Sequence, residues 1–203
     1  MQWFYKLARA VVWFLFTIWF DIDYQNTENI PEGRGGYITA CNHTSYLDPL
    51  MIAFKQKPWI RYMAKGELYK LTGLVWLFKW LGTIPVDRGN ADMSAIDRCV
   101  GAIKDGYVLG IFPEGTRYPQ NEPGRPKSGM ALIAKTTKAD ILPCAIRYER
   151  PLKFKSKVTV MYGKLIPYAE LGLDEDSPRA LKRATKRVWG EILGMLGLDG
   201  EAA

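Results

Sequence analysis

Short apolar runs alternate with longer segments of helical periodicity along most of this chain. The runs predict strands at 36–41, 59–64, 107–112, 141–148 and 157–162, and 82–89 predicts a brief strand that ends in a charged turn at 87–89. The other segments predict a helix beginning at 49 and helices at 71–81, 91–105, 127–139 and 176–196. Strands that alternate with helices predict a single α/β domain with a largely parallel mixed sheet flanked by helices.

The amino-terminal segment, residues 1–20, has a different pattern. Aromatic residues come first with the cations Lys6 and Arg9, and an apolar run from 10 to 20 follows. As a helix, this run covers about half of a ~30 Å hydrocarbon core. We therefore expect 1–20 to be a membrane-associated helix at the interface, and 21–203 to be the main domain. The alternative is a helix buried in the protein's own core.

The predicted helices at 71–81 and 176–196 differ in how their apolar residues are arranged. The first is apolar nearly all round, with Lys79 as its only charge, so it is buried, faces a membrane or lines an apolar substrate channel. The second is amphipathic and carries a basic stripe along its first half. We expect its apolar face to pack against the domain rather than to form a second membrane contact.

Composition and charge narrow the class of partner. At 203 residues, without a Pro/Gly/Ser-rich linker, the chain fits one core. A hydrophobic content of 48% with a net charge of +7 indicates an anionic membrane surface or an anionic substrate, the alternative being a merely basic soluble protein. The aromatic residues lie mostly within aliphatic runs, so no nucleic acid partner is expected.

The cysteines limit the chemistry further. Cys41, Cys99 and Cys144 are widely spaced and form no Cys-x-x-Cys, so neither a disulfide framework nor a zinc site is predicted. We expect no metal and no cofactor. Cysteine usage suits a reducing compartment, and no small-residue cleavage site follows the amino-terminal apolar run. We therefore expect the protein on the cytoplasmic face of the cell membrane, either peripheral or monotopic.

The single histidine of the chain, His43, lies at the turn between the strand at 36–41 and the next helix. Asp48 follows five positions later. Either Ser45 caps the helix with Asp48 at its third position, or Asp48 caps it with Pro49 at the first. Both arrangements place Asp48 beside His43, whereas one continuous helix with this spacing would turn the two side chains apart.

A neutral imidazole oriented by a carboxylate is suited to act as a general base on a hydroxyl. The chain has no Gly-x-Ser-x-Gly motif, so the hydroxyl is expected to belong to the substrate. The alternative is an N-cap aspartate beside an incidental histidine. A further polar group, 113–117, directly follows the strand at 107–112, and ligands gather at such carboxyl ends in open α/β sheets.

These polar groups belong to an ordered set of motifs. The set comprises Asn42-His43 with Asp48, Gly82 to Arg88, Phe112 to Arg117 reading Phe-Pro-Glu-Gly-Thr-Arg, and the proline-bearing strand Ile141 to Ile146. Over residues 35–165 it resembles the glycerolipid acyltransferase family, most closely the bacterial 1-acyl-sn-glycerol-3-phosphate acyltransferases. Tyr118 stands where serine is common in the family, which bears on headgroup preference, and Cys144 stands where an aliphatic residue is common.

The resemblance implies an acyltransferase of phospholipid biosynthesis. Such an enzyme transfers a fatty acyl group from a thioester, either acyl-ACP (acyl carrier protein) or acyl-CoA, to the free hydroxyl of lysophosphatidic acid, and phosphatidic acid forms. His43 would be the general base and Asp48 its orienter. The alternative is an acyltransferase-like lipid-binding or remodelling protein that acts on another lysolipid acceptor.

The resemblance also implies a substrate-binding set. Arg88 and Arg117 would bind the acceptor phosphate, because a guanidinium matches phosphate geometry. Backbone amides near Gly115 would stabilise the charge that develops on the thioester carbonyl. In a competing interpretation, Arg117 pairs with Glu114 and only shapes the loop. The full set is Arg88, Glu114, Gly115, Thr116, Arg117 and Lys127, with Glu114 and Thr116 holding the loop or the glycerol oxygens and Lys127 the weaker phosphate candidate.

Overall fold

The computed structural model describes residues 2–33, 35–56, 60–66, 83–86 and 93–198. Its described strands form one seven-stranded sheet in the order β1-β7-β6-β2-β5-β3-β4. β6 and β7 are antiparallel, and the other neighbouring strands are parallel, which confirms the predicted α/β domain with a largely parallel mixed sheet. The strands are β1 (Asp21–Gln25), β2 (Ile38–Cys41), β3 (Ile60–Lys65), β4 (Ile84–Val86), β5 (Val108–Ile111), β6 (Ile141–Tyr148) and β7 (Lys157–Tyr162).

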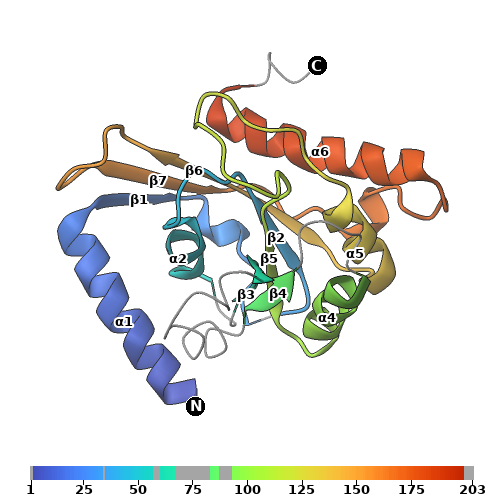
Figure 1. Ribbon diagram of the computed structural model, residues 1–203, viewed down its shortest axis with the longest axis horizontal. Helices are drawn as coiled ribbons and strands as arrows, with labels where there is room; N and C mark the ends of the chain where they lie inside the picture. The colour runs from blue at the N-terminus through green and yellow to red at the C-terminus, as the bar shows by residue number, and fades with distance from the viewer. Residues whose placement is uncertain (1, 34, 57–59, 67–82, 87–92, 199–203) are drawn as a thin grey trace.

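Helices cover both faces of the sheet (Figure 1). α4 (Met93–Lys104), α5 (Gly129–Thr137) and α6 (Pro178–Leu196) lie on one face, and α2 (Asp48–Ala53) lies on the other with the end of α1 (Gln2–Trp19). Side chains of a strand point to opposite faces in turn. Accordingly, Ile141 of β6 joins the core beneath α4, α5 and α6, and Leu142 joins the core beneath α2. The 3-10 helices η1 (Thr27–Asn29) and η3 (Tyr168–Glu170) lie in connections.

α6 shows how local sequence sets the limits of a helix. The side-chain oxygen of Ser177 accepts a hydrogen bond from the amide of Ala180, and Pro178 occupies the first turn. Gly197 ends the helix in the left-handed conformation with φ of 71°, which glycine adopts without steric cost. Its apolar side chains are buried, including Val188 and Ile192, so the predicted packing of this helix against the domain is confirmed.

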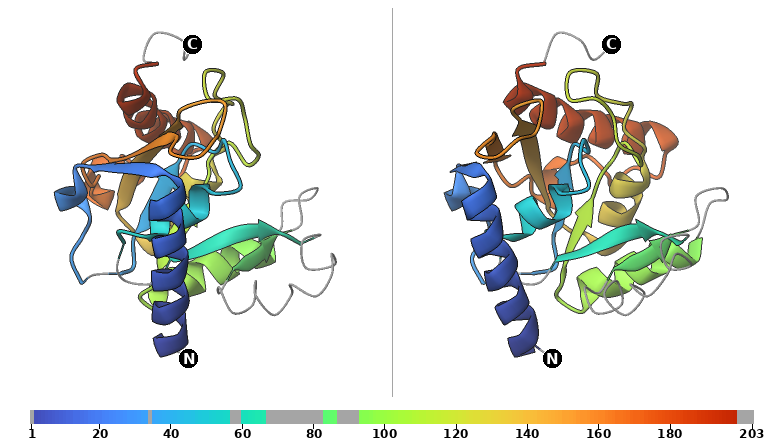
Figure 2. Two further views of the ribbon diagram at one scale, coloured as in Figure 1. Left: turned by 90° about the vertical axis from the view of Figure 1, so that its left-hand side faces the viewer. Right: turned by 60° about the vertical axis from the view of Figure 1, so that its left-hand side comes forward.

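The carboxyl-terminal half of α1 packs one face against the domain and exposes the opposite face. The rings of Trp13 and Phe16 lie with their centroids 5.0 and 5.5 Å from that of Phe54 on the domain. The described part of α1 is therefore not wholly buried in the protein's own core, because an apolar stripe on it is exposed. Within the described ranges, no helix is both long enough and apolar enough to cross a bilayer. The amino-terminal half of α1 reaches away from the sheet (Figure 2). The exposed stripe consists of Val11, Phe14, Leu15, Ile18 and Trp19.

The predicted elements agree best with the structure where the pattern is strongest. β6 and β7 have the predicted bounds, and α4 and α5 lie inside the predicted helices. β1 has no counterpart among the predictions, since its short sequence Asp-Ile-Asp-Tyr-Gln is mostly polar. The predicted helix at 71–81 and the predicted turn at 87–89 lie outside the described residues.

Candidate functional site

Asp48 is a fully buried carboxylate that accepts hydrogen bonds from several directions. Its Oδ2 accepts from the ring Nδ1 of His43 at 2.8 Å and from the backbone amides of Thr44 and Ser45 at 2.8 and 2.9 Å. Its Oδ1 accepts from the hydroxyl of Tyr148 at 2.7 Å. An ionised carboxylate only accepts, so Nδ1 of His43 carries the proton and Nε2 keeps the lone pair that a general base requires.

The local caps differ from both predicted arrangements. α2 begins at Asp48 after an N-cap at Leu47, so the arrangement with Asp48 as N-cap is wrong. Of the predicted capping box, the contact from the Asp48 carboxylate back to the Ser45 amide forms. The Ser45 hydroxyl instead accepts from the amide of Leu47, at 3.2 Å. Asp48 therefore holds the turn that carries His43, in addition to the imidazole itself.

The imidazole is also held by an aromatic stack. The ring of His43 lies on that of Phe112, with centroids 4.0 Å apart and planes at 17°. Tyr62 stacks on the same phenyl ring at 5.9 Å, and its hydroxyl donates to the carbonyl of Pro49 at 2.9 Å. The side chain of His43 remains 15% exposed. The ring is thus fixed by Asp48 and Phe112 while part of it stays accessible.

Glu114 ties two loops together beneath His43. Its Oε2 accepts from the backbone amide of His43 at 2.6 Å, and its Oε1 accepts from the amide of Gly124 at 2.8 Å. Burial raises the pKa of Glu114 to about 7, against the lowering effect of the two amides, and the charge of Asp48 adds to the rise. Among the described residues no ion pair joins Glu114 to Arg117, so the interpretation of Arg117 as a partner of Glu114 is wrong.

The turn after β5 brings the other predicted residues together. Gly115 has φ of 73°, and its amide donates to the carbonyl of Phe112 at 3.0 Å. That amide is therefore already used within the turn. The Nζ of Lys127 lies 3.1 Å from the position that a Cβ on Gly115 would take. Thr116 is exposed in the same turn. Arg88 lies outside the described residues.

Arg117 is oriented by an aromatic ring. Its guanidinium carbon lies 3.3 Å from the ring centroid of Tyr46, which belongs to the His43 turn. A cavity of about 610 Å³ opens beside this pair. Arg150 lies on the same cavity and donates to the carbonyl of Thr44 at 3.3 Å. The lining of this cavity combines the guanidinium groups of Arg117 and Arg150 with Thr44, the residue that follows His43. The lining residues are Thr44, Arg117, Tyr118, Pro119, Gln120, Asn121, Glu122, Tyr148 and Arg150.

Sequence reasoning assigned no role to two buried residues that hold this site. The hydroxyl of Tyr148 stays protonated because burial, and then the neighbouring Asp48, raise its pKa. The side chain of Asn42 exchanges two hydrogen bonds with the backbone of Ile146, at 3.0 and 2.8 Å, and so continues the β2–β6 pairing past the end of β2. Asn42 was noticed only as part of a motif. The only sequence signal for Tyr148 is its place at the end of a strongly predicted strand.

Comparisons with known proteins show which proteins this chain is similar to. A family model described as Acyltransferase matches residues 21–147. The 1-acyl-sn-glycerol-3-phosphate acyltransferase of Bacillus subtilis (strain 168) is 30% identical over 172 residues, covering 82% of this chain and 84% of that protein. The protein of the same name from Streptococcus pneumoniae (strain ATCC BAA-255 / R6) is 34% identical over 159 residues, covering 77% of this chain and 58% of that protein. The crystal structure of the 1-acyl-sn-glycerophosphate (LPA) acyltransferase PlsC from Thermotoga maritima has a TM-score of 0.73 and 24% identity, covering 98% of this chain and 80% of that chain.

Proposed function

This chain belongs to the acyltransferase family, and from that premise we propose that it is a 1-acylglycerol-3-phosphate O-acyltransferase. It transfers a fatty acyl group from an acyl thioester to the free hydroxyl of lysophosphatidic acid, and phosphatidic acid forms. The observation that carries this proposal is the 2.8 Å contact between His43 and the buried carboxylate of Asp48, beside a cavity that carries arginines. The names of the bacterial relatives support the acceptor.

The dyad supplies the proton transfers of the reaction. Nε2 of His43 takes the proton of the acceptor hydroxyl as its oxygen attacks the thioester carbonyl carbon. The tetrahedral intermediate collapses, the C–S bond breaks, and the imidazolium returns the proton to the leaving thiolate. Asp48 fixes the tautomer of His43 and stabilises the imidazolium that forms between the two steps.

The acceptor phosphate binds at the arginine-bearing cavity. Arg117 is the principal contact, because stacking on Tyr46 fixes the plane of its guanidinium fork. Arg150 lies on the same cavity, and Lys127 lies near the turn at Gly115. We assign Arg88 to the same phosphate on the motif alone. Glu114 acts by holding the backbone of the His43 turn, as both of its oxygens accept amide hydrogens.

The substrate class implies a membrane, since lysophosphatidic acid is a lipid. We propose that α1 lies in the membrane interface on the cytoplasmic face, through its exposed apolar stripe. The acyl donor is acyl-ACP or acyl-CoA. Purified protein given each donor in turn with lysophosphatidic acid decides between them.

A turnover assay tests the proposed function. The protein is incubated with a thioester donor and either lysophosphatidic acid or monoacylglycerol, and the products are separated. We expect phosphatidic acid to form, and acylation of the monoacylglycerol to be slower because it lacks the phosphate. Folded protein that produces no phosphatidic acid with either donor would be a lipid-binding relative without this activity. Faster transfer to another lysolipid would reassign the acceptor.

A further inference from the structure

The loop that joins β6 to β7 has the composition of a membrane-contacting element. We call residues 150–155 the hairpin tip; every residue of it is exposed. Leu152 and Phe154 expose 36% and 58% of their surface. Lysines at 153 and 155 alternate with these apolar residues, and Arg150 precedes them. Apolar side chains between cations are typical of segments that bind anionic bilayers.

The hairpin tip is an ordered turn. The amide of Lys153 donates to the hydroxyl of Ser156 at 2.9 Å, and the amide of Ser156 donates to the carbonyl of Lys153 at 3.0 Å. Ser156 itself is fully buried. Phe154 is thus presented to solvent by a turn whose backbone hydrogen bonds are already formed, so its exposure is a property of the fold.

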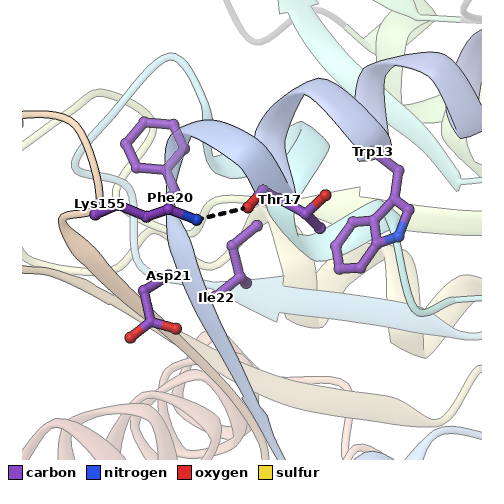
Figure 3. Close-up of a pocket in the computed structure, with 6 residues that line it drawn as sticks. All are labelled: Trp13, Thr17, Phe20, Asp21, Ile22 and Lys155. Carbon is purple, nitrogen blue, oxygen red and sulfur yellow. Dashed lines mark hydrogen bonds between the residues drawn. The ribbon is translucent and has the colours of Figure 1, made fainter.

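The tip is joined directly to the end of α1. The amide of Lys155 donates to the carbonyl of Trp19 at 2.7 Å, and the ring of Phe154 meets that of Trp19 at a centroid distance of 5.7 Å. The ammonium of Lys155 donates to the carbonyl of Thr17 at 3.4 Å (Figure 3). A cavity of about 380 Å³ lies between the helix and the tip, lined by Trp13, Thr17, Phe20, Asp21, Ile22 and Lys155.

The exposed stripe of α1 continues onto the tip. Phe14, Leu15 and Ile18 lie on one side of the helix with Trp19, as their spacing requires, and are 63%, 56% and 45% exposed. Trp19 connects this stripe to Phe154. Helix and tip lie on the same side of the domain, away from the amino-terminal end of α6 (Figure 1).

We propose that the hairpin tip is a second bilayer-contacting element, which places Leu152 and Phe154 among the headgroups of an anionic membrane beside α1. Lys153 contacts a lipid phosphate, while the ammonium of Lys155 stays with the carbonyl of Thr17. The inference rests on the proposed function only in that α1 is taken to lie at a membrane. Two exposed acids lie nearby: Glu149 accepts from the amide of Lys157 at 3.0 Å, and Asp21 lines the cavity behind the tip. A single helix leaves the domain free to rotate about the helix axis, and a second contact removes that freedom.

Partition of the full-length protein into vesicles tests the proposal. Vesicles of phosphatidylcholine, with and without phosphatidylglycerol, are sedimented with the wild type and with Phe154→Ser and Lys153→Gln. We expect Phe154→Ser to lower partition by about tenfold in both lipids, as loss of a buried aromatic side chain implies. Lys153→Gln should lower it about fivefold with phosphatidylglycerol only, the effect of one cation near an anionic surface.

Two matched variants separate the contribution of the tip from general effects of substitution on vesicle binding. Lys182→Gln removes an exposed lysine from α6, on the other face of the sheet, and should partition about as the wild type does. Phe154→Trp keeps an aromatic side chain and should retain binding. Thermal melting checks that each variant is folded. The proposal would be overturned if both Phe154→Ser and Lys153→Gln partitioned into the vesicles as the wild type does.

Turnover measurements distinguish this proposal from the proposed function. With a short-chain, water-soluble lysophosphatidic acid, Phe154→Ser and Lys153→Gln should turn over at the wild-type rate, since neither residue lines the cavity beside the catalytic turn. A wild type that makes no phosphatidic acid would refute the acyltransferase assignment and leave the vesicle result intact. Unchanged partition with slower use of acyl-ACP, but not of acyl-CoA, would show that the tip docks an acidic protein and overturn the membrane assignment.

Discussion

Replacing Tyr148 with phenylalanine tests whether the dyad depends on a residue that no motif contains. The change removes one hydroxyl that donates to Oδ1 of Asp48 at 2.7 Å and keeps the buried ring. Asp48 keeps its contacts to His43, Thr44 and Ser45. One oxygen of a buried carboxylate loses a donor, and no water reaches it freely because Asp48 is fully buried.

The expected cost follows from the charge on the acceptor. A hydrogen bond to a charged group contributes about 1.5–3 kcal/mol to stability, and one between neutral groups about 0.5–1.5 kcal/mol. Tyr162 supplies the neutral comparison, because its buried hydroxyl donates to the carbonyl of Ile52 at 3.0 Å. We therefore expect Tyr148→Phe to lower the free energy of unfolding by roughly 1 kcal/mol more than Tyr162→Phe.

Activity should change in a way that stability alone does not explain. Asp48 still orients His43 in Tyr148→Phe, so the turnover number should fall by no more than about tenfold, against about 10²–10⁴-fold for loss of a general base. With one donor removed, the carboxylate holds an imidazolium more strongly. The acidic limb of the pH–rate profile should therefore move to higher pH, while that of Tyr162→Phe should not.

Denaturant titration and a pH series of acyl transfer measure both effects. Equal destabilisation by the two substitutions, with the same pH–rate profile as the wild type, would show that Tyr148 only packs. Loss of turnover as complete as that of Asp48→Asn would contradict the argument in the other direction, because it would mean that the remaining contacts do not hold Asp48.

Further predictions concern the base, the phosphate contact, the buried acid and the helix. His43→Ala should remove nearly all turnover, and Asp48→Asn should lower it by about 10²–10⁴-fold with substrate binding retained; near-normal turnover by folded His43→Ala would refute the mechanism. Arg117→Lys should raise the Michaelis constant for lysophosphatidic acid roughly tenfold, with less effect on the donor, when each is varied separately. If only the Michaelis constant for the donor rose, the assignment of Arg117 to the phosphate site would be refuted. The pKa of Glu114 is raised to about 7 in the folded protein, so the contribution of Glu114 to stability should fall as pH rises from about 4.5 through 7, by up to roughly 1.4 kcal/mol per pH unit. Glu114→Gln should lack this fall in denaturant titrations across that range, and an identical pH slope in both proteins would contradict the assigned shift. Replacing Phe14 and Ile18 on the outer face of α1 with serine should move the protein from the membrane to the soluble fraction, with Trp13 and Phe16 still packed on the domain. If that variant sedimented with membranes as the wild type does, the proposal that α1 lies in the membrane interface would be refuted.

The pattern of apolar and polar residues predicts which strands and helices form better than it predicts which of them lie side by side. β6 and β7 have continuous apolar or alternating sequences, and their predicted bounds are those of the structure. β1 is short and mostly polar, and it is a strand because β7 offers it a parallel partner, which periodicity does not register. The caps at Ser45 and Asp48 were misassigned because several polar side chains compete for the same few amides.

The contacts that build the site depend on strand order. Asp48 can be paired with His43 from the turn alone, because five residues separate them. Tyr148 comes from 100 positions away, and it reaches Asp48 because β6 lies next to β2. Glu114 reaches the amide of His43 because β5 lies on the other side of β2. A sequence pattern predicts that each strand exists and leaves open which strands are adjacent.

That adjacency explains how a dyad works without a protein nucleophile. β2 has β6 on one side and β5 on the other, and all three end at the same edge because they are parallel. The carboxylates at this edge have different tasks. Asp48 is fully buried, and hydrogen bonds from the imidazole, two amides and a tyrosine hydroxyl surround its charge. Glu114 has two amide donors, and burial raises its pKa to about 7, so it can hold the His43 turn without placing a second full charge beside Asp48. In the proposed mechanism the imidazole therefore faces one fully charged carboxylate at Nδ1, and its Nε2 is left for the hydroxyl of the substrate.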